Sequence, residues 1–372
     1  MGSGLAFTQD LTPALPGSAI SLAADGLGPD LIPLEELADC VETALARDGR
    51  TILSYGPGAG YTPLRELIAG WFGVHPSRVV LTNGRLHGLA LLARLLLPMR
   101  SVIAEYPIHD RAEQVFLEAG ASLIAVPIGE GGMVVEDLQN TLGQYVRPAM
   151  VYAIPNFHNP TGWTTGSDGR SRVVDLVIRQ NLVQTEQILL VEDDTYGLTR
   201  FEGESLPALF DLSGGRSVYS SSFSATIAPG LRVGFFVLPE GLAEELDELA
   251  TSTYITPVLL AQAAVFEFLN RGALEPHLAR LREGLKARRD SMLAALETHL
   301  PDATWSRPEG GFFVWVQLPG YPDGREVLKR AEGVTACDGT RFGAVSSALR
   351  LSFAFAAPDE IEAGVERLAA AL

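Results

Sequence analysis

The chain has 372 residues, 47% of them hydrophobic, and a formal net charge of −17. This composition supports a sizeable core in one large and one smaller domain, whereas the acidic charge argues against nucleic acid and anionic membranes as partners. The longest apolar run, residues 89–99, is interrupted by Arg94 and Pro98 and is too short to span a bilayer. Two distant cysteines and a start without signal-peptide character predict a cytoplasmic protein.

Short Val- and Ile-rich runs alternate with amphipathic helical patterns through the first two thirds of the chain. Strands are expected near residues 78–81, 101–105, 122–127, 149–154, 188–192, 217–221 and 231–238. Helices are expected between them, for example at residues 63–72, 85–97, 111–119 and 167–181. Such alternation predicts an α/β fold with a mostly parallel, seven-stranded sheet that is sandwiched by helices.

The last third of the chain has a different pattern. A long helix is expected at residues 274–299, followed by short strands near 311–317, 333–337 and 349–353 and a final helix from Asp359. These elements predict a smaller α+β domain, and we place the domain change near residue 250. The expected organisation is an N-terminal arm over residues 1–30, a large domain over 31–250 and a small domain over 251–372.

Two predicted strand ends carry polar residues that suit ligand binding. Gly84 and Arg85 lie where a strand passes into a helix, and the free N–H groups of such a junction favour a phosphate. Asp193 and Tyr196 follow an apolar strand, at the end of a parallel sheet where ligands bind. Taken alone, the first segment is more simply an ordinary turn. An acidic strand end is often only a solvated loop, but the D-x-x-Y spacing after a hydrophobic strand argues against that interpretation of the second segment.

Several further segments decide between these interpretations. They are residues 55–65 (YGPGAGYTPLR), 105–109 (EYPIH), 155–162 (PNFHNPTG), 222–232 (SFSATIAPGLR) and 348–353 (ALRLSF). In their order and spacing, these segments resemble the class I/II aminotransferase superfamily of fold-type I enzymes, which depend on pyridoxal phosphate (PLP). The resemblance covers nearly the whole chain. It implies a PLP transferase that acts on an L-amino acid through external aldimine and quinonoid intermediates, most simply as an aminotransferase.

The resemblance also assigns roles to individual residues. It places Gly84, Arg85, Leu86, Ser222, Ser224 and Arg232 around the cofactor phosphate. His109 would stack on the cofactor ring, Asp193 would pair with the ring nitrogen, and Asn159 and Tyr196 would contact the phenolate oxygen. Arg350, Gly26 and Asn159 are the expected substrate-binding residues. Tyr55 would reach the phosphate of a neighbouring subunit, which implies a homodimer with shared active sites.

One residue departs from the family at its most diagnostic position. Ala225 stands where the family has the lysine that holds PLP covalently and moves the substrate proton. Two explanations are open, an engineered Lys-to-Ala change and a natural pseudoenzyme. We favour engineering, because Asn159, Asp193 and Arg350 persist among the cofactor and substrate contacts. The chain is then expected to bind PLP non-covalently, or as a substrate aldimine, without turnover.

Other departures keep alternative functions open. Arg85 and Leu86 differ from the usual family residues, as do His109 and residues 337–340 (CDGT). The departures at Leu86, His109 and residues 337–340 suggest a specialised substrate. The runner-up is a biosynthetic lyase or carbon–carbon bond-forming enzyme, acting for example on S-adenosylmethionine. A second alternative is a non-catalytic PLP-binding pseudoenzyme. Aminotransferase-like regulators carry an N-terminal DNA-binding domain, whereas only a short arm up to Asp30 precedes the large domain here.

Overall fold

A mixed sheet forms the centre of the large domain. The computed structural model describes residues 19–144, 148–318, 320 and 323–372. The strands run in the order β2 (Val79–Thr82), β9 (Gly234–Val237), β8 (Val218–Ser222), β7 (Leu189–Asp193), β6 (Pro148–Ala153), β3 (Ser101–Tyr106), β4 (Ser122–Gly129) and β5 (Gly132–Met133). Strands β3, β4, β6, β7 and β8 are parallel, whereas β9 and the two-residue β5 are antiparallel to their neighbours. The predicted mostly parallel sheet is thus confirmed, with β5 as an added edge strand.

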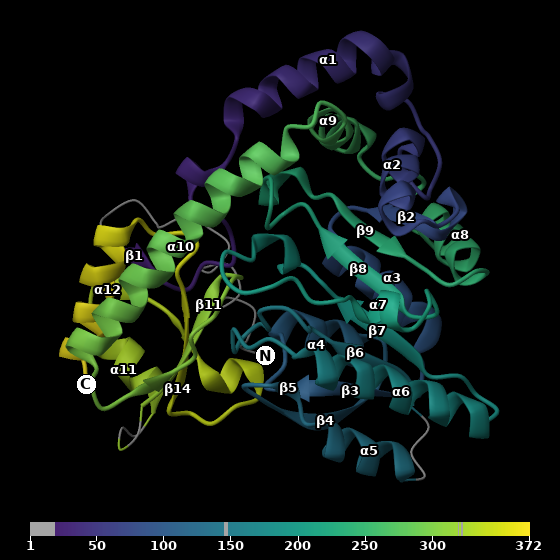
Figure 1. Ribbon diagram of the computed structural model, residues 1–372. Coiled ribbons are helices and arrows are strands. Elements are labelled where there is room, and N and C mark those ends of the chain that lie inside the picture. Colours follow the sequence, from purple (N-terminus) through teal and green to yellow (C-terminus); the bar gives the residue numbers. More distant parts are fainter. Residues whose placement is uncertain (1–18, 145–147, 319, 321–322) are drawn as a thin grey trace.

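Helices cover both faces of this sheet, which explains why its central strands are apolar throughout (Figure 1). One cluster of buried residues joins the strands to α3 (Arg85–Leu96), α4 (Asp110–Glu118) and α8 (Leu242–Tyr254). Another joins them to α5 (Val135–Gly143), α6 (Ser167–Val183) and the short α7 (Leu209–Leu212). The helices expected at residues 85–97, 111–119 and 167–181 are observed with bounds that differ by at most two residues, the usual uncertainty of helix ends.

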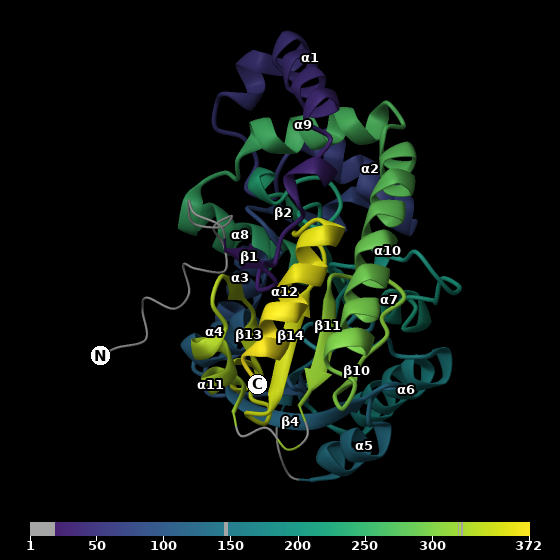
Figure 2. The same cartoon turned by 90° about the vertical axis from the view of Figure 1, so that its left-hand side faces the viewer.

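Further helices extend the molecule beyond the β2 edge of the sheet. α1 (Leu34–Ile52) lies along α9 (Leu259–Asn270), and α2 (Thr62–Phe72) packs between them and the sheet. The long α10 (Leu274–His299) leads from this group of helices to the small domain (Figures 1 and 2). No helix within the described ranges is both long enough and apolar enough to cross a membrane.

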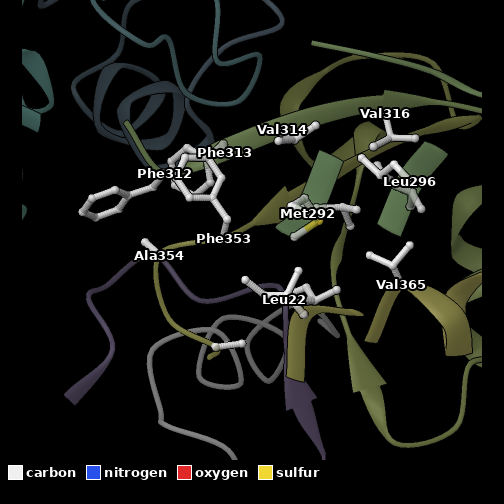
Figure 3. Packing of buried hydrophobic residues seen from close by; sticks show 14 of the residues in the cluster. Leu22, Met292, Leu296, Phe312, Phe313, Val314, Val316, Phe353, Ala354 and Val365 are labelled. Atoms are coloured by element: carbon white, nitrogen blue, oxygen red, sulfur yellow. The ribbon is translucent and has the colours of Figure 1, made fainter. Parts of the chain in front are cut away.

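The small domain contains an antiparallel sheet packed against two helices. Its strand order is β10 (Thr304–Trp305), β11 (Phe313–Gln317), β14 (Ala348–Ser352) and β13 (Cys337–Asp338). α10 packs against α12 (Pro358–Ala370), α11 (Gly324–Arg330) lies near β13, and β1 (Ile20–Ser21) pairs with β12 (Val334–Thr335). Leu22, Met292, Val316 and Val365 meet in the core between these elements (Figure 3). Burying one such side chain contributes roughly 1.5–3 kcal/mol, so the N-terminal segment is held firmly through Leu22.

Candidate active site

A cavity of about 620 Å³ lies where the parallel strands end and the two domains meet. Its wall is formed by the N-terminal segment, the starts of α3 and α4, the segments that follow β6, β7 and β8, and the loop after β14. The lining residues include Asp25, Gly26, Arg85, Leu86, His109, Arg111, Asn159, Thr195, Tyr196, Ser222, Ser224, Ala225, Arg232 and Phe355. A cavity of this size suits a cofactor-sized ligand. It lies at the carboxyl ends of β7 and β8, where open α/β sheets bind ligands.

Hydroxyl and guanidinium groups gather at one corner of the cavity. Ser222 ends β8, its Oγ lies 2.9 Å from Ser224 Oγ, and Arg232 Nη1 donates to Ser224 Oγ over 3.4 Å. Gly84 lies beside them with a φ of +87°, and a Cβ at this position would lie only 2.2 Å from Arg232 Nη2. Because Gly84 has no side chain, the Arg232 guanidinium can lie close to the start of α3. We call this corner, made of Gly84, Ser222, Ser224 and Arg232, the anion cup.

The anion cup has the chemistry of a phosphate site. Among the described residues, no carboxylate lies within ion-pair distance of Arg232. The first N–H groups of α3 lack helical partners, and the helix dipole adds positive charge at its start. Hydroxyls, a guanidinium and such N–H groups together bind a phosphate dianion through charge-assisted hydrogen bonds.

Asp193 lies at the end of β7 and is 2% exposed. Its Oδ1 accepts a hydrogen bond of 2.8 Å from Thr195 Oγ1, and its Oδ2 accepts one from the Tyr152 hydroxyl. Arg85 Nη1 lies 2.5 Å from the same Oδ2. Arg85 was expected beside the phosphate, and its backbone does begin α3 next to the anion cup, but its guanidinium extends to Asp193. Both oxygens of Asp193 therefore have partners within the chain.

Arg350 on β14 is fully buried behind Asp25 and Asn159, which line the cavity. Its Nη1 donates to Asn159 Oδ1 over 2.9 Å, and its Nη2 donates to the carbonyl oxygen of Ala23 over 3.0 Å. The same Nη2 lies 2.6 Å from Asp25 Oδ1. The guanidinium also lies 4.2 Å from the centre of the Phe313 ring. Arg350 and Asn159, both expected to bind the substrate, are thus in contact, and Asp25 joins them.

His109 precedes α4 and is buried in the cavity wall. Burial lowers the pKa of His109 well below its ordinary value, and the guanidinium groups of Arg85 and Arg350 lower it further. The imidazole is therefore neutral near pH 7. Its Nδ1 is buried and has no hydrogen-bond partner among the described residues.

Ala225 lies in the turn after β8 and is 3% exposed. Its methyl group lines the cavity and belongs to the same buried cluster as Tyr196. Burial raises the pKa of Tyr196, which stays a neutral phenol at physiological pH. The two lysines of the sequence, Lys286 and Lys329, lie on the surface in ion pairs with acidic residues of α10, α11 and a nearby loop. Neither lysine lines the cavity.

Tyr55 does not reach the cavity of its own chain. Its side chain is 80% exposed, on a surface that also carries the exposed residues Leu53, Ile255 and Val258. The segments are adjacent, because Thr256 Oγ1 donates to the Pro57 carbonyl oxygen over 3.5 Å. Four further residues at the site were not expected there: Asp25, Arg111, Tyr152 and Thr195. Asp25 and Thr195 adjoin assigned residues, but no pattern distinguished Tyr152 within its strand or Arg111 within its helix.

The residues present suit PLP, with one conflict. The anion cup matches its phosphate, and Asn159 and Tyr196 offer polar groups to the rest of a ligand in the same cavity. Asp193 is the acidic partner that a protonated ring nitrogen would need, but Arg85 already occupies that position. A bound PLP ring would therefore have to displace the Arg85 guanidinium.

The fold and the residues of the site are those of the aminotransferase class of proteins. The chain belongs to the family "Aminotransferase class I and II", whose model matches residues 29–368. A 2-aminoadipate transaminase of Thermus thermophilus is 36% identical over 95% of this chain and 90% of the relative. An uncharacterised HTH-type transcriptional regulator of Bacillus subtilis is 32% identical over 94% of this chain and 73% of the relative.

A solved structure has the same fold. It is the alpha-aminoadipate aminotransferase of Thermus thermophilus in complex with N-(5'-phosphopyridoxyl)-L-leucine. It superposes with a TM-score of 0.90 and 34% identity, over 95% of this chain and 92% of that chain. The expected fold-type I architecture is thereby confirmed, and the family implies PLP as its cofactor.

Proposed function

We propose that this chain binds PLP non-covalently in the cavity and that it does not complete transamination while residue 225 is alanine. The observation that carries the proposal is that the anion cup, Asn159 and Tyr196 line one cavity together with Ala225. With a lysine at position 225, the same cavity would serve an aminotransferase acting on an L-amino acid. The 2-aminoadipate relative supports such a substrate class.

The chain's own residues would position the ligands. Ser222, Ser224 and Arg232 hold the phosphate, and Asn159 and Tyr196 offer an amide and a phenol to the ring oxygen. PLP, when bound, supplies an electron-accepting ring for cleavage of a bond at the substrate α-carbon. Arg350 binds the substrate carboxylate, since a guanidinium fork matches a carboxylate in two hydrogen bonds.

The alanine removes two functions at once. A methyl group can neither attach a cofactor nor accept a proton, and no lysine elsewhere in the sequence reaches the cavity. His109 is neutral and lies in the cavity wall, where its ring can contact a ligand. It does not replace an amine nucleophile, because the covalent attachment that the family uses needs one.

The surface around Tyr55 supports a homodimer as part of this proposal. Leu53, Tyr55, Ile255 and Val258 are more than half exposed on adjacent segments. Clusters of exposed apolar residues on a folded protein commonly mark protein–protein contacts. In the dimer, Tyr55 would reach the cavity of the partner and complete it.

The direct test is an absorbance titration with PLP, followed by borohydride reduction and mass analysis. We expect saturable binding and no covalent adduct, whereas an adduct on Lys286 or Lys329 would contradict the proposal. The variant Ala225→Lys then identifies the reaction. Pyridoxamine phosphate together with a keto acid would indicate an aminotransferase, and release of a leaving group with PLP retained would indicate the lyase or synthase.

A non-catalytic binding protein is a second candidate function. Arg85, His109 and Ala225 all depart from the family pattern, and the structure places all three in the wall of one cavity. A single replacement of the lysine explains Ala225 but leaves Arg85 and His109 without an explanation. This candidate predicts that Ala225→Lys binds PLP and turns over no amino acid.

A further inference from the structure

We infer that Arg85 competes with the cofactor ring for Asp193. In the cofactor-free protein, the Arg85 guanidinium pairs with the carboxylate that would otherwise pair with a protonated ring nitrogen. The inference rests on the proposed PLP site and adds a residue that sets the affinity of that site. It concerns a side chain that the family pattern would have placed beside the phosphate.

The position of Arg85 between Asp193 and the cavity carries the inference. Arg85 lines the cavity, whereas Asp193 is 2% exposed and is not part of the cavity wall. Arg85 Nη1 lies 2.5 Å from Asp193 Oδ2 and donates to the Tyr152 hydroxyl over 3.4 Å. The guanidinium therefore covers the carboxylate from the side on which a ligand would arrive.

The backbone of Arg85 lies beside the anion cup, at the opposite end of the residue from its contact with Asp193. The residue opens α3 directly after Gly84, which contacts Arg232 in the anion cup. The side chain thus extends from the phosphate corner to Asp193, across the space between these two ligand-binding positions. A ring whose phosphate is held in the cup and whose nitrogen faces Asp193 would occupy the same space.

Charge gives the physical reason for the competition. A buried carboxylate is costly unless a cation neutralises it, and within the described part of the chain Arg85 is the cation at ion-pair distance from Asp193. A protonated ring nitrogen would bring the same charge. Both oxygens of Asp193 already have partners in the chain, so a ring nitrogen would reach the carboxylate only by displacing the Arg85 guanidinium. Cofactor binding must therefore break the internal ion pair.

The test compares PLP affinities of the wild-type chain, Arg85→Gln and Arg85→Lys by absorbance titration. Glutamine removes the charge at similar size, so we expect Arg85→Gln to bind PLP at least about tenfold more tightly, as 1.4 kcal/mol corresponds to a factor of ten. Arg85→Lys keeps the charge and should bind like the wild type. Arg111→Gln is the matched control, because Arg111 also lines the cavity but lies near Asp25 rather than Asp193. It should give no gain in affinity.

The outcomes separate the inference from the proposed function. If Arg85→Gln bound PLP and the chain with Arg85 did not, the result would support the inference. It would contradict the proposal that the chain with Arg85 binds PLP non-covalently. Equal or weaker binding by Arg85→Gln would overturn the inference and leave the proposed function intact. Failure of both proteins to bind would overturn both.

A second measurement needs no cofactor. Thermal unfolding of Arg85→Gln, Asp193→Asn and the double variant forms a double-mutant cycle. We expect Arg85→Gln to lower the Tm, because Asp193 loses its counter-charge, and the double variant to recover part of that loss. Strictly additive changes in Tm would show that the pair is not coupled and would overturn the inference.

Discussion

The carboxylate of Asp25 lies 2.6 Å from a guanidinium nitrogen of Arg350, which the family resemblance assigns to the substrate carboxylate. The N-terminal segment that carries Asp25 is anchored on both sides, by β1 and Leu22 before it and by the Gly28 N–H bond to the Ala354 carbonyl oxygen after it. A ligand carboxylate therefore competes with a fixed internal carboxylate for the same guanidinium. In the same way, the Arg85 guanidinium and the Asp193 carboxylate neutralise each other without any ligand.

Replacing Asp25 with asparagine should strengthen the binding of carboxylate ligands. N-(5'-phosphopyridoxyl)-L-leucine is a suitable probe, because it combines the cofactor phosphate with an amino-acid carboxylate. We expect Asp25→Asn to raise its affinity several-fold in a calorimetric titration, since a competing charge is lost. Arg350→Gln should lower it by about 30- to 150-fold, the equivalent of 2–3 kcal/mol for a charge-assisted pair.

PLP itself is the control for this experiment, because it has no amino-acid carboxylate. Its affinity should be nearly the same in Asp25→Asn and in the wild type. A loss of affinity for the leucine conjugate in Asp25→Asn would show that Asp25 assists ligand binding and would contradict the competition.

A lysine at position 225 should allow the site to hold PLP covalently. We expect Ala225→Lys to hold PLP covalently, since the residue lines the cavity beside Tyr196. Borohydride reduction and peptide mass analysis would locate the adduct at position 225. Ala225→Arg supplies charge without a nucleophile and should give no adduct. If Ala225→Lys also remained unmodified, Ala225 would not be the family's lysine position.

Removing the guanidinium of the anion cup should weaken phosphate binding specifically. Arg232→Gln is expected to lower PLP affinity by about 30- to 150-fold, because a charge-assisted contact contributes roughly 2–3 kcal/mol. Pyridoxal, which lacks the phosphate, should bind the variant and the wild type equally. An equal loss for both ligands would assign Arg232 a structural role instead.

A buried carboxyl group behind the site should make stability depend on pH. Burial raises the pKa of Glu105 to about 7, although its Oε2 accepts a hydrogen bond from the Ile154 N–H. Because the folded-state pKa lies above the unfolded value, this group's stabilising contribution is fully present below about pH 4.5 and is lost as pH rises through about 7.

The variant Glu105→Gln tests this dependence by chemical denaturation at several pH values between 5 and 8. It keeps an oxygen for the Ile154 N–H but cannot ionise, so its unfolding free energy should fall less with rising pH. The difference should be on the order of 3 kcal/mol at most, at 1.36 kcal/mol per pKa unit. Glu118→Gln, at an exposed position, should retain the wild-type slope.

A charge on the surface around Tyr55 should prevent dimerisation. Val258→Asp places a carboxylate among exposed apolar residues, and we expect a monomer in size-exclusion chromatography with light scattering. Leu182→Asp is the matched control, because Leu182 is also exposed but lies at the end of α6. A dimer that persists in Val258→Asp would place the interface elsewhere.

Much of the fold could be predicted because it depends on local patterns. Strands β6 and β7 are buried over nearly their whole length, and they appear in the sequence as short continuous apolar runs. The helix at residues 274–299 has the bounds that its pattern predicts. The strand expected from residue 231 begins only at Gly234, because residues 229–231 form a turn and Arg232 adopts a φ of +53°. β5 was missed because two residues carry no periodic signal.

The sequence by itself determined the family, the order of the elements and the identity of half of the residues that line the cavity, since these depend on spacing along the chain. It also led to the prediction that Ala225 occupies the position of the family's lysine. Only the tertiary structure decided which charges meet. Arg85 pairs with Asp193 and Asp25 pairs with Arg350 because the fold brings residues distant in sequence together at the cavity wall and directly behind it, where a buried charge needs an opposite partner within a few ångströms.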